Sequence, residues 1–127
     1  MAHEQASIDI DRSPEDVWAL VGQFGGLDEW MPGIDSCRVE GDDRFLEMLG
    51  MNITEHLVAR DDDARSITYS ITAGLPVDHH EATITVTASG DGSHVTWDVD
   101  AAPDEMAGVM VGAYQTALET VKKHLSA

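Results

Sequence analysis

The stretch PDEMAGVMVGAYQTALETVKKHL, residues 103–125, predicts one long amphipathic helix at the end of the chain. Its apolar residues recur three and four residues apart, so they fall on a single helical stripe. Such a helix runs roughly 34 Å at about 1.5 Å per residue, which is long enough to cross a small sheet. Methionine and tyrosine in mid-stripe favour an adaptable surface, as expected of a lid over a hollow interior. The stripe comprises Met106, Val109, Met110, Ala113, Tyr114, Ala117, Leu118, Val121 and Leu125.

The first part of the chain predicts one strand followed by two short helices. Apolar and polar residues alternate over residues 6–10, as they do in a half-buried strand. The sequence SPED at residues 13–16 offers a capping hydroxyl, a proline at the first helical position and acids in the first turn. Together these are typical of a helix start. A second short helix is expected around residues 27–31, before Pro32 and Gly33 end it.

Six further strands are predicted between residues 34 and 100. Segments of β-favouring residues alternate there with turns rich in glycine and aspartate, and such a succession forms an antiparallel meander. We therefore predict a single α+β domain over residues 1–127. It consists of a seven-stranded curved antiparallel sheet around the long C-terminal helix, with two short helices after the first strand. The expected strands are residues 34–40, 44–49, 53–60, 66–73, 79–88 and 94–100.

The chain is strongly acidic, with 24 Asp and Glu against 7 Lys and Arg and a formal net charge of −17. This charge repels phosphate backbones and anionic lipid surfaces, so no nucleic-acid partner and no membrane docking are expected. No apolar run approaches the roughly 18 residues of a membrane-spanning helix, so no membrane insertion is expected either. One cysteine and the lack of a signal-peptide pattern predict a cytoplasmic protein. The acidic surface fits either ordinary solubility or a salt-rich cytoplasm.

Six short phrases follow one another along the chain: SPEDVW at 13–18, WMPGI at 30–34, TEHL at 54–57, ITYSI at 67–71, LPV at 75–77 and VTW at 95–97. In this order they resemble the Bet v 1-like superfamily. The resemblance is strongest to its bacterial polyketide cyclase/dehydrase and lipid-transport branch, also called SRPBCC or START-like. It implies a helix-grip fold around a deep hydrophobic cavity, in which relatives carry or transform lipids, steroids, polyketides or plant hormones. Two features depart from the family pattern. The span 40–44 is short and lacks a glycine-rich loop, and His80 stands where relatives often have tyrosine.

Apolar and aromatic residues that face the predicted cavity are the candidate ligand contacts. Strand alternation places some of them on inward faces, and the second short helix and the helical stripe supply the others. Aromatic rings and thioethers together suit flat, mostly apolar ligands, although ordinary core packing explains the same residues. The candidates are Trp30, Met31, Leu57, Ile71, Trp97, Met106, Met110 and Tyr114.

Three polar residues, Glu55, Tyr69 and His80, are candidates for chemistry. Glu55 lies between the inward-facing Ile53 and Leu57, so its carboxylate needs a partner or a raised pKa. With Glu55 and His80 as acid and base and Tyr69 polarising a carbonyl, the set would suit a polyketide cyclase or dehydratase. In the alternative interpretation, Glu55 pairs with a side chain of a neighbouring strand and His80 makes an ordinary polar contact.

No metal and no cofactor are expected. The adjacent His79 and His80 would face opposite sides of a strand, and no two histidines have the i, i+4 spacing of a helical metal site. The leading hypothesis is a cytoplasmic protein, monomeric or homodimeric, that binds a hydrophobic or aromatic small molecule between sheet and helix. The cyclase or dehydratase is the second hypothesis. The third is a protein-interaction module whose cavity is filled by side chains.

Overall fold

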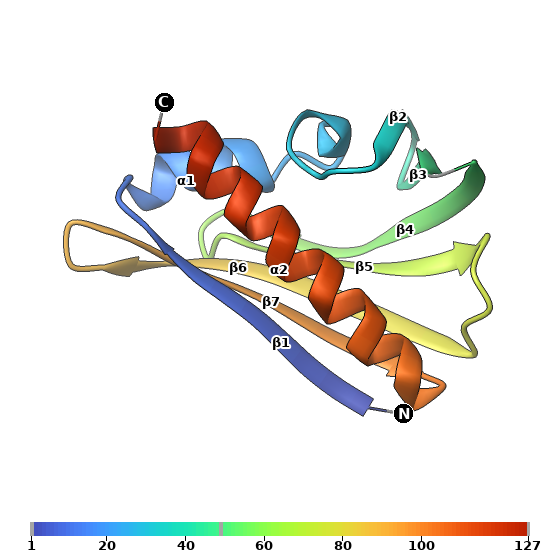
Figure 1. Ribbon diagram of the computed structural model, residues 1–127. Coiled ribbons are helices and arrows are strands. Elements are labelled where there is room, and N and C mark those ends of the chain that lie inside the picture. Colours follow the sequence, from blue (N-terminus) through green and yellow to red (C-terminus); the bar gives the residue numbers. More distant parts are fainter. Residues whose placement is uncertain (1, 49, 127) are drawn as a thin grey trace.

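Seven antiparallel strands form one curved sheet, and the long C-terminal helix lies across its inner face (Figure 1). The computed structural model describes residues 2–48 and 50–126. The strand order is β1-β7-β6-β5-β4-β3-β2, so the first strand of the chain pairs with the last. The predicted architecture is therefore confirmed. The elements are β1 (Ala2–Ile10), α1 (Pro14–Val21), the 3-10 turn η1 (Leu27–Glu29), β2 (Ile34–Glu40), β3 (Asp43–Met48), β4 (Met51–Asp61), β5 (Ser66–Ala73), β6 (His79–Ser89), β7 (Gly92–Ala102) and α2 (Asp104–Ser126).

The first helix begins and ends for local reasons. The Ser13 hydroxyl accepts a hydrogen bond from the Asp16 N–H at 3.2 Å, and Pro14 occupies the first helical position, as predicted. Gly22 follows the helix, and a Cβ there would lie 2.7 Å from the Trp18 ring. Glycine is therefore the residue that lets the chain turn away so close to its own helix.

The second helix is shorter than predicted. Only the single 3-10 turn η1 forms, and Trp30 and Met31 follow it instead of lying within it. Glycines at 25 and 26 precede the turn and Pro32 follows, so the intervening residues have room for one turn only.

Helix α2 is anchored to one side of the sheet by its C-terminal half. It packs mainly against β1 and β7, and Ala117, Leu118 and Val121 are fully buried there. The Gln115 side chain fastens the helix to β1, because it donates to the Ser7 carbonyl at 3.0 Å and accepts from the Ser7 N–H at 3.3 Å. The opposite side of the sheet, β2 to β5, therefore curves past the helix without such close packing.

The N-terminal half of α2 leaves two residues of the apolar stripe exposed. Val109 is 67% exposed and Ala113 is also exposed, although both belong to the apolar stripe. Both residues face a hollow between α2 and the far side of the sheet, so no side chain covers them.

Candidate ligand-binding site

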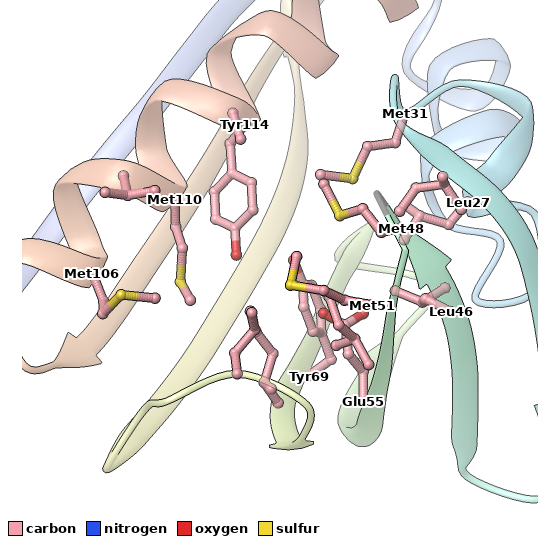
Figure 2. Close-up of a pocket in the computed structure, with 16 residues that line it drawn as sticks. Leu27, Met31, Leu46, Met48, Met51, Glu55, Tyr69, Met106, Met110 and Tyr114 are labelled. Atoms are coloured by element: carbon pink, nitrogen blue, oxygen red, sulfur yellow. The ribbon is translucent and has the colours of Figure 1, made fainter.

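A cavity of about 310 Å³ lies between α2, the η1 segment and the inner face of β3, β4 and β5 (Figure 2). Val109 on α2 and Met51 on β4 both line it and are both exposed, so the cavity opens between α2 and the β3–β4 hairpin. Of the sixteen described lining residues, Glu55 alone is charged. They are Leu27, Met31, Ile34, Leu46, Met48, Met51, Ile53, Glu55, Tyr69, Ile71, Leu75, Met106, Val109, Met110, Ala113 and Tyr114.

Methionine dominates this lining. Five of the six methionines of the chain face the cavity, from the segment after η1, from both strands of the β3–β4 hairpin and from α2 (Figure 2). Unbranched thioether side chains fill irregular gaps and change rotamer easily, so such a wall can adjust to ligands of different outline. Met48 and Met51 were not predicted as contacts. The sequence feature that could have identified them is their position on either side of the Gly50 turn, which places both methionines at the tip of the β3–β4 hairpin.

Glu55 forms a buried ion pair with Arg44 at the base of the cavity. The two residues lie directly opposite each other on β3 and β4, and both side chains are more than nine-tenths buried. Arg44 Nε and Nη2 lie 2.7 Å and 2.6 Å from Oε1 of Glu55, and Nη1 donates to the Phe24 carbonyl at 3.0 Å. The guanidinium carbon also lies over two rings, 4.5 Å from the centre of Phe24 and 4.6 Å from that of Tyr69. Its position is thus fixed on every side.

Two opposing effects act on the Glu55 carboxyl. Burial raises the pKa of Glu55, while the charge and hydrogen bonds of Arg44 act to lower it. Arginine does not release its proton in proteins, so protonation of Glu55 would leave a buried cation without its counter-charge. The ionised carboxylate is therefore the form that suits the pair. The alternative prediction, that Glu55 pairs with a side chain of a neighbouring strand, agrees with this ion pair, although the sequence did not identify Arg44 as the partner.

Tyr69 and Tyr114 bring hydroxyl groups to the cavity from opposite sides. Tyr69 comes from β5 and Tyr114 from α2, and Figure 2 shows the Tyr114 hydroxyl directed towards the sheet. Trp97 Nε1 donates to the Tyr69 hydroxyl at 3.1 Å, and the Trp97 ring stacks on Tyr114 with centroids 4.0 Å apart. Burial raises the pKa of Tyr69 and also that of Tyr114, so both remain protonated phenols at neutral pH.

His80 lies behind Tyr114, away from the cavity wall. Its Nδ1 accepts the Ile71 N–H at 3.0 Å, and its Nε2 lies 3.2 Å from the Tyr114 hydroxyl. An accepting Nδ1 places the proton of the neutral ring on Nε2, which then donates to Tyr114. Burial, with a smaller effect of His79, lowers the pKa of His80 to about 4. His80 is thus neutral at physiological pH and holds Tyr114 in place.

The structure brings some of the predicted site residues together and separates others. Glu55, Tyr69, Met31, Ile71, Met106, Met110 and Tyr114 line the cavity, whereas His80, Trp30, Trp97 and Leu57 are not among its lining residues. Tyr114 stacks on Trp97 and covers it, and Trp30 packs against Trp97 with centroids 5.6 Å apart. Leu57 is half-buried in the middle of β4, two residues beyond Glu55 and next to a bulge in the pairing of β4 with β5. The expected direct ligand contacts of these four residues are therefore not supported by their positions.

Neither a metal centre nor a membrane-spanning helix is found in the described part of the chain. Within residues 2–48 and 50–126, no three histidine, cysteine or acidic side chains gather closely enough to hold a metal ion. None of the helices there has the length and apolarity that crossing a bilayer requires.

Comparison with known proteins places the chain in a family. The model of the family described as "Polyketide cyclase / dehydrase and lipid transport" matches residues 1–126. The chain belongs to this family. Members of its superfamily bind hydrophobic ligands. Among curated proteins, none matches the chain.

Solved structures of similar proteins agree with this assignment. The protein XoxI from Bacillus cereus is 33% identical with a TM-score of 0.92, and the match covers 98% of this chain and 95% of that one. A START superfamily protein from Mycobacterium smegmatis is 17% identical with a TM-score of 0.79, over 97% and 98% of the two chains. Ara h 8.0201 is 16% identical with a TM-score of 0.81, over 99% of each. The latter two show the fold alone, and they confirm the predicted Bet v 1-like helix-grip fold.

Proposed function

We propose that this member of the polyketide cyclase and lipid-transport family binds a hydrophobic or aromatic small molecule, lipid-like or polyketide-like, in the cavity between the sheet and α2. The observation that carries the proposal is an open, methionine-lined cavity of about 310 Å³ with one charged residue in its described wall. Apolar cavities of this size, with few polar groups, are typical of small-molecule sites. At the packing density of protein interiors, this one would hold roughly a dozen non-hydrogen atoms.

The open cavity argues against a protein-interaction module whose interior is filled. We place the protein in the cytoplasm, because its single cysteine suits a reducing compartment. As its oligomeric state we propose a monomer or a homodimer. No cofactor is proposed.

The Ala113→Trp variant tests the proposal. Ala113 lines the cavity from α2, so an indole there would occupy the space that a ligand needs. We expect native mass spectrometry to detect a small molecule bound to the purified wild-type protein and none bound to the variant. The variant should also bind added decan-1-ol at least tenfold more weakly than the wild type. Thr116→Trp is the matched control, since Thr116 is exposed on the same helix and does not line the cavity. Equal ligand binding by Ala113→Trp and the wild type would contradict the proposal.

A polyketide cyclase or dehydratase is the second candidate, because Glu55 and Tyr69 both reach the cavity wall. In this reaction Glu55 would move the proton and Tyr69 would hydrogen-bond a substrate carbonyl. His80 would act as a positioning residue through Tyr114, since its ring nitrogens are engaged by Ile71 and Tyr114.

The Glu55→Gln variant tests this second candidate. If Glu55 is the general acid or base, cyclisation of a poly-β-ketone thioester should slow by about 100-fold or more, with the affinity for that substrate within tenfold of wild type. Glu47→Gln, on the exposed side of β3, is the control for the change of charge. An unchanged rate in Glu55→Gln would end the assignment.

A further inference from the structure

The charge arrangement at the base of the cavity restricts what the ligand can be. Both short contacts from Arg44 fall on Oε1 of Glu55, at 2.7 Å and 2.6 Å. The other oxygen, Oε2, accepts no hydrogen bond from the residues that the structure describes, although Glu55 is 94% buried and lines the cavity. Glu55 lines the cavity, so Oε2 is the carboxylate oxygen open to a ligand, and a ligand group that donates to it would form a charge-assisted hydrogen bond in apolar surroundings.

Arg44 is not available to bind an anion. Its Nε and Nη2 are held by Glu55 and its Nη1 by the Phe24 carbonyl, and its guanidinium carbon lies over the rings of Phe24 and Tyr69. Arg44 does not line the cavity, and the described lining contains no basic residue. A ligand carboxylate would therefore lose its hydration, meet the negative charge of Glu55, and find no cation in return.

The Tyr69 hydroxyl adds a second polar contact beside Glu55. It accepts from Trp97 Nε1 and interacts with the Tyr114 hydroxyl. Burial raises the pKa of Tyr69, while the hydrogen bond with Tyr114 acts to lower it, as expected when Tyr69 is the acceptor. With Tyr69 accepting from both, its own proton can be donated to a ligand oxygen. A hydroxyl group can donate to Glu55 and accept from Tyr69 at once, and an ammonium group can donate to Glu55 with the added benefit of opposite charge. The rest of the lining is apolar, so the remainder of the ligand is hydrocarbon.

Resting on the proposed function, we infer that the cavity takes apolar molecules with a hydrogen-bond-donating head group, an alcohol or an amine, and rejects free carboxylic acids such as fatty acids. Glu55 is the residue that sets this preference. The ligand lies with its head group at Glu55 and its hydrocarbon part among the methionines towards the opening at Val109 and Met51.

Three probes of equal chain length test the inference: decan-1-ol, decylamine and decanoate, each titrated below its micelle concentration at pH 8 by calorimetry. We expect the alcohol and the amine to bind the wild-type protein at least tenfold more tightly than decanoate. In Glu55→Gln, where Arg44 loses its counter-charge, decanoate should gain at least tenfold and become preferred over decylamine. Glu47→Gln carries the same change of net charge on the outer face of β3 and should leave the ratio of amine to acid within twofold.

The double variant Arg44→Met/Glu55→Leu guards against a folding defect in Glu55→Gln, since it removes both charges together. The double variant should bind decan-1-ol, and it should bind neither decylamine nor decanoate more tightly than this alcohol. Decanoate binding to the wild type as tightly as decylamine would overturn the inference and leave the proposed function standing. Failure of all three probes to bind the wild type would overturn both.

Discussion

The Arg44→Met variant should unfold with a free energy about 3–5 kcal/mol below that of the wild-type protein, because it leaves the Glu55 carboxylate buried without its partner. The loss includes the hydrogen bond to Phe24 and the stacking of the guanidinium on Phe24 and Tyr69. Urea unfolding followed by tryptophan fluorescence measures it. Replacing both charges, in Arg44→Met/Glu55→Leu, should recover most of the stability, to within about 1–2 kcal/mol of wild type.

A second arginine provides the control for this experiment. Arg38 also pairs with a glutamate, Glu40, and also stacks on a phenylalanine, Phe45, but both charged side chains are more than 60% exposed. Arg38→Met should therefore cost less than about 1 kcal/mol. If Arg44→Met were no more harmful than Arg38→Met, the buried pair would contribute nothing to the fold, and the argument that Glu55 is held as an anion would fail with it.

The second large effect is a loss of stability on acidification that depends on His80. Burial lowers the pKa of His80 to about 4, whereas in the unfolded chain the ring titrates near 6.5. As the pH falls from 6.5 to 4, the unfolded chain takes up a proton that the folded protein does not, so the folded state loses stability throughout that window. The contribution is complete above pH 6.5 and amounts to about 3 kcal/mol.

Comparison of two adjacent histidines isolates this effect from that of the many carboxylates. The free energy of unfolding, measured by urea titration at intervals between pH 7 and pH 4, should fall about 3 kcal/mol further in the wild type than in His80→Gln. His79→Gln, which changes the exposed neighbour, should retain most of the wild-type slope. Parallel curves for His80→Gln and the wild type would show that the imidazole is not kept neutral by burial.

The fold was largely predictable because it depends on local patterns. The alternation in the strands and the stripe of α2 are both repeated several times, so small errors at element ends do not alter the topology. The error at η1 arose where the signal is short: residues 25–33 contain three glycines and a proline, and their apolar residues fit a helix or a loop equally well.

The site was less predictable because it depends on partners across strands. Strand alternation correctly placed Glu55 and Tyr69 inward, but it could not say that Arg44 lies opposite Glu55, which requires the register of the β3–β4 hairpin. Trp97 was correctly predicted to face inward. That it is covered by Tyr114 depends on where α2 crosses the sheet, and no pattern within either segment contains that information.

Helix α2 combines two segments of different strength in one continuous element. Its C-terminal half is tied to β1 and β7 by several fully buried side chains and by Gln115. Its N-terminal half buries Ala107 and Met110, but it also spans the hollow and contains Gly108 and Gly112. Each glycine weakens a helix by about 1 kcal/mol relative to alanine, and open space surrounds both positions. We therefore expect the first turns of α2 to shift or fray at a lower cost in free energy than the C-terminal half, so the mouth of the cavity can adjust to a ligand without unfolding the rest of the protein.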